Sequence, residues 1–334
     1  MKRLMKKVTT CLLGAAIAAV ILAGCGTSEK TDNPNADVKV ALLLEGSLGD
    51  ESINDQAYEG LKLVGDKFGV TTKYVECTDS STYVDTLRSL SENGYSLIVC
   101  DAFNFADALR EVAPYYPDVN FAIFDSAIED IDNVTSFMYA SHESSFLAGV
   151  AAAITSESGI IGFIGGMEIP GIVRFQVGFE EGVHYVNPEA KVITKYIGND
   201  NSAWSDPATA KSLAIDCINN GADVCYHAAG GSGIGMIEAC TEKDVWAIGV
   251  NVDQAHLSPD RVLTSALTKG DQAIYLFTES YLNGSILKGL YDLDCSNDGV
   301  GLVDSEHLSE EAKEAVQQAK EKISNGEIKV TKYE

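Results

Sequence analysis

The run Val38-Lys39-Val40-Ala41-Leu42-Leu43-Leu44, followed by a stretch of helical periodicity at 52–68, decides the fold class. A short and almost continuous apolar run indicates a strand that is buried on both faces of a sheet. The periodic stretch after it indicates a helix that covers the strand. A buried strand followed by a covering helix is the repeating unit of a parallel α/β sheet.

This unit recurs along the chain in two sets. In the first set we expect strands at 71–75, 96–100 and 120–124 and helices at 83–91 and 104–112. In the second we expect helices at 143–154, 174–185, 207–219 and 233–240, with strands at 159–164, 191–196, 223–226 and 245–250. The sequence therefore predicts an α/β protein of two doubly wound, Rossmann-like lobes. Ligands bind such sheets at the carboxyl ends of the strands, so we expect a ligand cleft between the lobes.

The N-terminus has the features of an export signal. Four basic residues come first, namely Lys2, Arg3, Lys6 and Lys7, and the apolar stretch 11–23 follows them. This stretch is too short for a stable membrane span, and it is typical of a secretory signal. It ends in Leu22-Ala23-Gly24-Cys25, which resembles the bacterial lipobox. We therefore predict a signal peptide at 1–24 and a lipid on Cys25, the alternative being an ordinary signal peptide with a chance cysteine.

Residues 25–36 join the lipidated cysteine to the globular part. Their sequence after Cys25, GTSEKTDNPNA, is small and polar and has no apolar periodicity. Such a composition favours a flexible tether. We expect it to hold the protein on the outer face of the cell membrane, or in the periplasm if the cell has two membranes.

The charge and the cysteines exclude some functions. The formal net charge is -25, and removal of the four basic residues of the leader takes it to -29. So acidic a surface argues against a nucleic-acid partner, which requires a basic footprint. Six cysteines remain beyond the leader and the lipobox, at positions 77, 100, 217, 225, 240 and 295, and none forms a C-x-x-C pair. We expect most of them to be reduced core residues.

Catalytic and metal signatures are missing from the sequence. It contains no G-x-x-x-x-G-K-[ST] loop, so the chain is not the ATPase of a transporter. The segment that starts at His142-Glu143 lacks the second histidine of a zinc protease. Gly231-Ser232-Gly233 does not fit the Gly-x-Ser-x-Gly frame of a hydrolase. We expect no catalytic residue, no metal and no cofactor.

Several segments in order resemble those of one family. They are Gly49 to Gly60, His142 to Gly149, Gly162 to Pro170 with Arg174-Phe175 and Gly178-Phe179, Ala229 to Gly233, and Gly249 to Gln254. Together they cover nearly the whole mature chain and resemble the basic membrane protein family of lipoproteins, the purine-nucleoside-binding receptors of ABC importers.

The resemblance implies a type I periplasmic-binding fold in which several strands cross between the lobes. The first lobe would comprise 37–142 and about 268–296, and the second 143–267 and about 297–334. A helix at 270–281 would return to the first lobe, and a C-terminal helix at 309–323 would pack on the second.

Two aspartates are candidates for the ribose. Asp125 follows the predicted strand 120–124 and Asp253 follows the strand 245–250, so both lie at carboxyl ends. Carboxylates accept charge-assisted hydrogen bonds from vicinal hydroxyls. The resemblance implies ligand-binding carboxylates at both positions. Asp50 and Asn54, in the segment after the first strand, are further ligand candidates, and the amide of Asn54 could both donate to and accept from the base edge.

The other candidates come from the second half of the chain. Trp204 lies in a loop where the family usually has phenylalanine, and it would stack on a base. Gly230 and Gly231 precede a helix, whose first amides can donate to a ligand acceptor. The resemblance implies that Lys269 also donates to the ligand.

One position departs from the family pattern. Ile53 stands where the family commonly has phenylalanine, so half of the expected base sandwich is aliphatic. Phe103, Phe105 or Tyr58 would have to supply the second aromatic face. The identity of the ligand depends on this point.

These observations together predict a monomeric solute-binding receptor of an ABC importer, working with a permease and a separate ATPase. Its ligand would be a nucleoside, with a purine favoured, and the lobes would close on it. Two alternatives remain. One is a receptor for another small polar ligand, such as a pentose, a signalling sugar or a free base. The other is a sensor that partners a membrane kinase or chemoreceptor.

Overall fold

The computed structural model describes residues 33–333, and β1 (Lys39–Glu45) is the buried strand that opens its first sheet. The helix α1 (Ile53–Phe68) follows it and buries Ala57, Leu61 and Val64, which recur at helical spacing on one face. The helix ends at Gly69, whose φ of 70° is easily adopted only by a residue without a Cβ.

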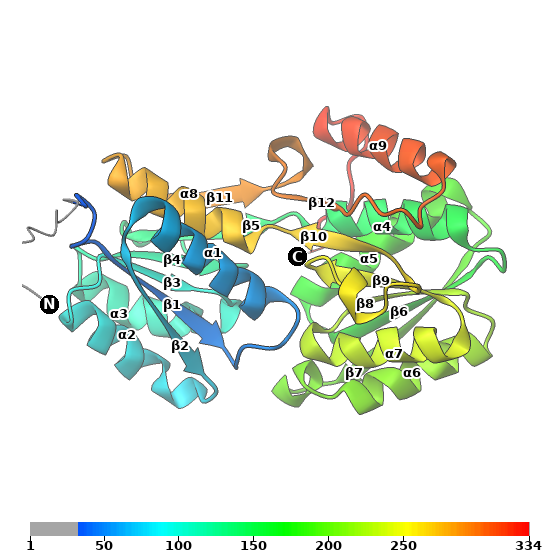
Figure 1. The fold of residues 1–334 in the computed structure, drawn as a ribbon, viewed down its shortest axis with the longest axis horizontal. Coiled ribbons are helices and arrows are strands. Elements are labelled where there is room, and N and C mark those ends of the chain that lie inside the picture. Colours follow the sequence, from blue (N-terminus) through cyan, green and yellow to red (C-terminus); the bar gives the residue numbers. More distant parts are fainter. Residues whose placement is uncertain (1–32, 334) are drawn as a thin grey trace, which may run out of the picture. The chain divides into compact units, whose positions relative to one another are not determined.

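The first sheet has six parallel strands in the order β11-β5-β4-β3-β1-β2. Its other strands are β2 (Thr71–Cys77), β3 (Leu97–Cys100), β4 (Asn120–Phe124), β5 (Val134–Tyr139) and β11 (Gly289–Leu293). Its helices are α1, α2 (Tyr83–Glu92), α3 (Ala106–Val112) and α8 (Gly270–Leu282), and α8 packs beside α1 (Figure 1). We call this sheet and its helices the first lobe.

The second sheet has six strands in the order β12-β10-β9-β8-β6-β7. They are β6 (Ile160–Met167), β7 (Lys191–Gly198), β8 (Val224–Ala228), β9 (Trp246–Asn251), β10 (Val262–Thr268) and β12 (Val300–Leu302), and β12 is antiparallel to β10. Its helices are α4 (Ser141–Thr155), α5 (Pro170–Val186), α6 (Pro207–Asn219), α7 (Gly233–Lys243) and α9 (Glu310–Ser324). We call this sheet and its helices the second lobe.

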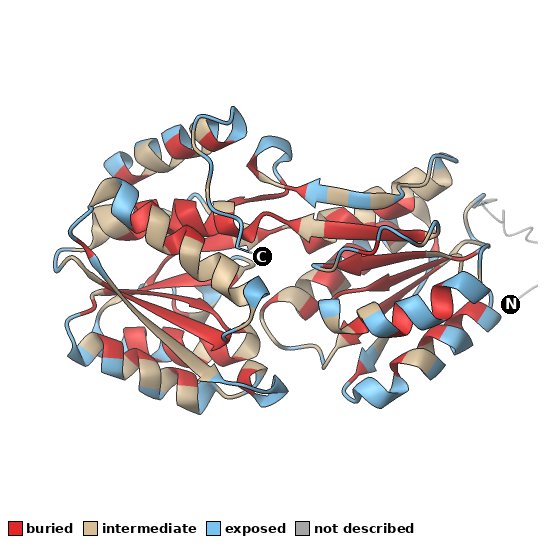
Figure 2. Cartoon of the chain, turned by 180° about the vertical axis from the view of Figure 1, so that it is seen from behind, coloured by how far each residue is buried: buried red, intermediate tan, exposed pale blue. Residues whose placement is uncertain are grey.

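Both sheets therefore use one strand order, in which the second strand of each set lies at an edge and the first lies beside the third. This is the doubly wound arrangement that the sequence predicts. The chain passes between the sheets from β5 into α4, from β10 into α8 and from β11 into β12. Residues 35–334 form one compact unit, and the strands of both sheets are largely buried (Figure 2). One hydrophobic cluster contains residues of both lobes, among them Leu42, Phe277, Phe146 and Ile323.

A few elements differ from the sequence-based expectations. The helix α5 begins at Pro170 and not at position 174, because a proline fits the first helical position, where its missing N–H costs nothing. The predicted helix at 104–112 is a 3₁₀ turn, Phe103–Phe105, followed by α3. β5 was not expected because the buried polar residues Thr135 and Ser136 interrupt its apolar pattern.

The predicted signal peptide, Cys25 and most of the tether lie outside the described residues. No helix among residues 33–333 combines the length and apolar character that a membrane crossing requires. The six cysteines of the described part are free thiols buried in the lobes, which confirms the prediction of reduced core residues.

Candidate functional site

The candidate site begins at the loops that follow the first and third strands of each set, and loops after other strands add residues to it. In this strand order the chain turns in opposite directions after these two strands, which leaves a crevice at their carboxyl ends. The loop after β1 carries Asp50, and the turn after β8 carries Gly231. A Cβ placed on Gly231 would lie 3.8 Å from the Cα of Asp50. The binding edges of the two lobes are therefore in contact.

Asp50 organises the start of α1. Its Oδ1 accepts from the backbone N–H groups of Ser52 at 2.9 Å and Asp55 at 3.2 Å, and its Oδ2 accepts from that of Asn54 at 3.1 Å. These are the unpaired amides of a helix N-terminus, where a carboxylate is favoured. Burial nevertheless raises the pKa of Asp50, although these three hydrogen bonds lower it. Asp50 shapes the loop, and its contact with ligand stays a prediction.

Asn54 lies under the same loop and is 5% exposed. Its Nδ2 donates to the carbonyl oxygens of Glu45 and Ser47, each at 3.0 Å. Both amide hydrogens thus hold the loop after β1, which leaves Oδ1 as the atom with which Asn54 can contact a base. The sequence-based expectation that Asn54 both donates to and accepts from the ligand is therefore reduced to acceptance.

Trp204 ends a short 3₁₀ helix, Asn201–Trp204, and lies across the carboxyl edge of the second sheet. A Cβ on Gly166, near the end of β6, would fall 2.1 Å from Cζ3 of the indole. A Cβ on Gly230 would lie 3.9 Å from Cε3, and Gly230 has a φ of 53°. The absence of side chains at these two glycines makes room for the indole beside the backbone. Trp204 thus lies at the sheet edge where a ligand would bind.

Asp125 follows β4 in the left-handed region, with a φ of 54°. A non-glycine residue in this conformation costs free energy, and such residues cluster at functional sites. Its carboxylate accepts weakly from the backbone N–H of Tyr139, at 3.4 Å. The side chain is exposed to water yet surrounded by enough protein that desolvation raises its pKa to about 6, although the positive charge of Arg174 lowers it. These features fit a carboxylate in a cleft.

Asp253 and Lys269 line one cavity of about 460 Å³. Residues of α1 form one wall, and residues that follow β9 and β10 form the other. The lining includes the carboxylates of Glu51, Asp55, Glu59, Asp253 and Asp271, and the bases His256 and Lys269. The excess of acceptors suits a ligand that donates from hydroxyl groups and disfavours an anion.

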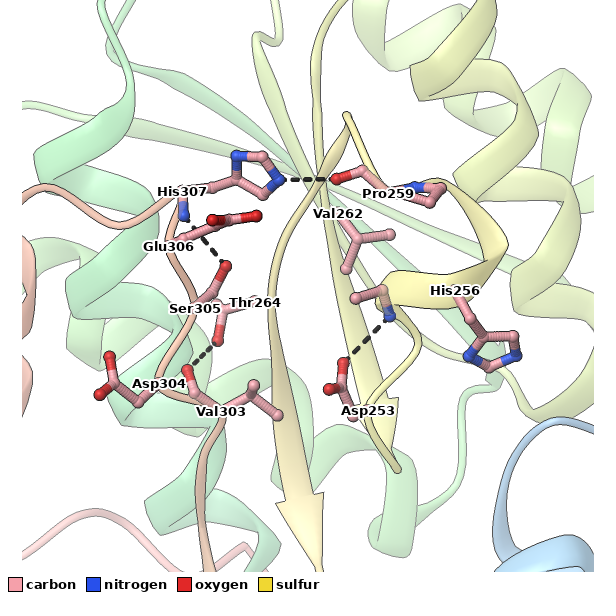
Figure 3. Close-up of a pocket in the computed structure, with 11 residues that line it drawn as sticks. Asp253, His256, Pro259, Val262, Thr264, Val303, Asp304, Ser305, Glu306 and His307 are labelled. Carbon is pink, nitrogen blue, oxygen red and sulfur yellow. Dashed lines mark hydrogen bonds between the residues drawn. The ribbon is translucent and has the colours of Figure 1, made fainter.

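A second cavity of about 310 Å³ lies wholly in the second lobe, between β10 and residues 303–307 (Figure 3). Asp253 is the predicted residue on its wall. His307 on the opposite side donates from Nε2 to the carbonyl oxygen of Pro259 at 2.6 Å. This cavity receives side chains from one lobe, whereas a cleft that closes on its ligand needs both. We therefore place the candidate site at the other cavity and the adjoining loops.

The structure distinguishes the three aromatic residues that could replace the missing phenylalanine at Ile53. Phe105 is fully buried and stacks on Tyr83, with ring centroids 4.1 Å apart. Tyr58 packs edge-on against Tyr74 at the exposed β2. Phe103 is 39% exposed and follows the carboxyl end of β3. Phe103 is therefore the one of the three that is available to a ligand.

Sequence reasoning missed two charged residues near the site. Arg174, in α5 of the second lobe, donates from Nε to the carbonyl oxygen of Tyr333 at 3.4 Å and affects the titration of Asp125 in the first lobe. Asp101, after β3, is 2% exposed, and its Oδ1 accepts from the backbone N–H of Glu45 at 2.9 Å. Its Oδ2 is buried without a partner, and burial raises its pKa well above the usual range. The position of Asp101 directly after a predicted strand could have indicated it, whereas the partners of both residues could not be read from the sequence.

No group of three or more histidine, cysteine, aspartate or glutamate side chains within residues 33–333 is arranged to hold a metal ion. The side chains described above are hydrogen-bonding and stacking groups.

Residues 37–334 match the family model described as ABC transporter substrate-binding protein PnrA-like. The chain is 34% identical to the ABC transporter nucleoside-binding protein BmpA of Lactococcus lactis, over 98% of this chain and 99% of that protein. It is 32% identical to basic membrane protein A of Borreliella burgdorferi, over 87% and 86%. Among solved structures it resembles an ABC transporter solute-binding protein from Aeropyrum pernix, with 27% identity and a TM-score of 0.79, over 87% of this chain and 92% of that one.

These similarities extend over both lobes, and they agree with the fold. They confirm the predicted type I periplasmic-binding fold and a solute-binding role instead of an enzymatic one. The chain belongs to the Bmp family, the PnrA-like substrate-binding proteins of ABC transporters.

Proposed function

We propose that this protein is the extracytoplasmic, lipid-anchored receptor of an ABC importer, and that it binds a nucleoside, with a purine favoured, by closing its lobes. The bound form would dock on the permease, and a separate ATPase would drive transport. No chemistry would occur on the ligand. The protein would act as a monomer, held to the membrane by a lipid on Cys25.

One feature supports the choice of ligand: the carboxyl ends of the two sheets carry different chemistry. The first lobe supplies Asp125, an exposed carboxylate whose pKa is raised by desolvation. When ionised, it can accept hydrogen bonds from the hydroxyl groups of a ligand. The second supplies Trp204, whose indole lies beside the sheet edge, and Asp253. A nucleoside has a flat aromatic base and a hydroxyl-rich ribose, so it offers one partner to each kind of group.

The charge of the cavity favours a nucleoside over a nucleotide. Five carboxylates and the bases Lys269 and His256 line it. A phosphate would add negative charge beside these acids, and electrostatic repulsion would oppose its binding. The roles of Asp50, Asn54, Gly230 and Gly231 are proposed on the same basis, as groups around the contact between the lobes.

Ile53 favours a second candidate function. It is half-buried at the start of α1 and offers no aromatic face. If Phe103 does not reach the base, the site has one stacking residue, Trp204. A receptor for a pentose or another small polar ligand would need no sandwich, so it remains the competing proposal.

Calorimetry on the mature chain with Cys25→Ser, which stays unlipidated, separates these proposals. The titrants are adenosine, guanosine, inosine, cytidine, uridine, the free bases, ribose and xylose. Binding of purine nucleosides with weaker or no binding of pentoses would support the proposal. Binding of a pentose but of no nucleoside would replace it with the second candidate.

The anchor is tested apart from the ligand. Cells that express the full chain would be fed a radiolabelled fatty acid, and the protein would be recovered from membranes. We expect label in the wild type and none in Cys25→Ser. Label-free wild-type protein in the medium would contradict lipid anchoring.

A further inference from the structure

The side chain of Gln254 joins the core of the second lobe to the first lobe. It is fully buried, and it lies on the loop after β9, directly after Asp253, which Figure 3 labels. Its Nε2 donates to the carbonyl oxygen of Glu51 in the first lobe at 2.7 Å. Its Oε1 accepts from the backbone N–H of Val250 at 3.0 Å and faces Nε2 of His227 at 2.9 Å.

These partners fix which atom of the amide is which. The N–H of Val250 can only donate, so it faces Oε1, and the carbonyl of Glu51 can only accept, so it faces Nε2. His227 must then donate from Nε2 to the amide oxygen. Its Nδ1 is buried without a partner, and desolvation lowers the pKa of His227 to about 4, so the ring stays neutral near pH 7.

The second lobe is shaped to hold this group in place. The backbone N–H of Gln254 donates to Oγ of the buried Ser265 at 3.1 Å. A Cβ on Gly249 would fall 2.7 Å from Oε1 of Gln254, and a Cβ on Gly233 would fall 2.0 Å from the ring of His227. Because every contact except the one with Glu51 lies in the second lobe, the amide is positioned before the lobes meet.

A neighbouring hydrogen bond acts at the same place. Nδ2 of Asn251 donates to Oγ of Ser52 at 2.8 Å. Glu51 and Asn251, on opposite sides of this contact, have φ values of 51° and 65°. Two strained residues facing each other across the lobes indicate a contact that the surrounding structure maintains.

We propose that Gln254 is a positioning residue that links the loop of Asp253 to the first lobe, holds the lobes together, and so sets how long a bound ligand is retained. The retention part rests on the proposed function, whereas the lobe contact does not depend on any ligand. Opening the lobes breaks the bond to Glu51 and leaves the bonds to His227, Val250 and Ser265 intact. The loop that carries Asp253 is therefore hydrogen-bonded to the first lobe through Gln254 only while the lobes are in contact.

The test is Gln254→Glu, with spin labels at Tyr115→Cys and Lys243→Cys, two exposed sites in different lobes, and the distance measured by pulsed EPR. The protein is the mature chain with Cys25→Ser, and the six cysteines of residues 33–333 are buried, so they do not take the label. At pH 8.5 the ionised glutamate cannot donate to the carbonyl of Glu51. We expect a longer distance between the lobes in the ligand-free protein, and a dissociation rate of any bound ligand raised about tenfold.

Position 254 is fully buried, and burial raises the pKa of a carboxyl group, so we expect the introduced glutamate to take up a proton at pH 5.5 and to donate again. The distance should then return to the wild-type value while the wild type itself does not change. An unchanged distance at pH 8.5, or a longer distance that acid does not restore, would overturn the proposal. The nucleoside proposal can fail without affecting this result, because the distance is measured without ligand.

His256→Ala is the matched control. His256 lies on the same loop, and its Nε2 is 2.8 Å from Oε2 of the same Glu51, but its side chain is 55% exposed. Exposed pairs contribute little, so we expect no change of distance. A change as large as that of Gln254→Glu would overturn the role given to Gln254.

Ser52→Ala keeps the test decisive if Gln254→Glu does not fold. Ser52 makes no side-chain hydrogen bond that caps α1, so its loss removes the bond from Asn251 without uncapping the helix. We expect a smaller shift toward longer distances. No shift would contradict a contact that holds the lobes together.

Discussion

The two sheets share one strand order but end in opposite chemistry. In the first lobe, acids follow three neighbouring strands: Glu45 ends β1, Asp101 follows β3 and Asp125 follows β4, and desolvation raises the pKa of each. In the second lobe the same edge carries glycines, the indole of Trp204 and the neutral pair of His227 and Gln254, and Asp253 is the carboxylate predicted there to bind ligand. The fold therefore fixes where a ligand meets the protein, and the residues after each strand fix what each lobe can offer it.

The largest expected effect tests the aromatic side. Trp204→Ala should weaken nucleoside binding by roughly 1–3 kcal/mol, the range found when a stacking aromatic is removed. Trp204→Phe keeps a flat face and should retain most of the affinity. Calorimetric dissociation constants measure both. An alanine variant with wild-type affinity would remove Trp204 from the site.

Gly166→Ala tests whether the position of the indole matters, because it leaves Trp204 itself unchanged in the sequence. Its Cβ would lie 2.1 Å from Cζ3 of Trp204, so the ring must move. We expect a loss of affinity somewhat below that of Trp204→Ala. Gly171→Ala is the control, because the Cβ at that position meets no atom within 4 Å. Equal nucleoside affinities for Gly166→Ala and Gly171→Ala would show that the position of the indole does not affect binding.

Asp125 in the first lobe should lower the stability of the folded protein at pH 7 while it strengthens nucleoside binding. The pKa of Asp125 is raised to about 6, so the folded state binds its proton more tightly than the unfolded state. Stability contributed by the protonated form is therefore lost as pH rises from about 4 through 6. At pH 7 Asp125→Asn should raise the free energy of unfolding, by roughly 1 kcal/mol after allowance for solvent exposure, and should weaken nucleoside binding.

Urea unfolding at pH 4 and pH 7, with calorimetry at pH 7, checks Asp125→Asn. Asp130→Asn is the control, since its ion pair with Arg110 is exposed and contributes little. A variant that loses stability at pH 7, or binds as well as the wild type, would contradict the role given to Asp125.

Asp101 extends this comparison to a buried acid. Because its pKa is raised well above the usual range, the wild type should lose stability as pH rises above about 4, by up to about 1.4 kcal/mol for each pH unit. Asp101→Asn removes this slope, although the amide leaves one buried donor without an acceptor. Chemical unfolding from pH 4 to 8 measures how the free energy of unfolding changes with pH in the wild type and in the variant. Equal slopes in variant and wild type would show that Asp101 is ionised.

The lobes should also respond to acid in opposite directions. His142 and His227 lie in the second lobe, and desolvation lowers the pKa of each to about 4. Their folded forms bind protons less tightly than the unfolded chain, so stability is lost as pH falls from about 6.5 to 4. On acidification, hydrogen exchange corrected for its intrinsic rate should become faster in β8 and β9 relative to β3 and β4. A uniform change would contradict the contrast between the lobes.

The sequence was sufficient to predict the repeating buried strands and covering helices, because their apolar spacing is local. It placed Asp125 and Asp253 after strands for the same reason. It could not show that Asn54 donates both amide hydrogens to carbonyl groups of the loop after β1, or that Gln254 donates to the carbonyl oxygen of Glu51 in the first lobe. These facts depend on partners far along the chain. The edge strand β11, half-exposed and with no regular apolar run, was also beyond a local pattern.

The most direct test of the account is the dissociation constant of adenosine measured with and without a 5′-phosphate, beside ribose, on the unlipidated mature chain. The account predicts tight binding of adenosine, much weaker binding of its monophosphate because of the acids around Asp253, and weak binding of ribose because it cannot stack on Trp204. Ribose or the monophosphate binding as tightly as adenosine would contradict the division of labour between an acidic first lobe and an aromatic second lobe.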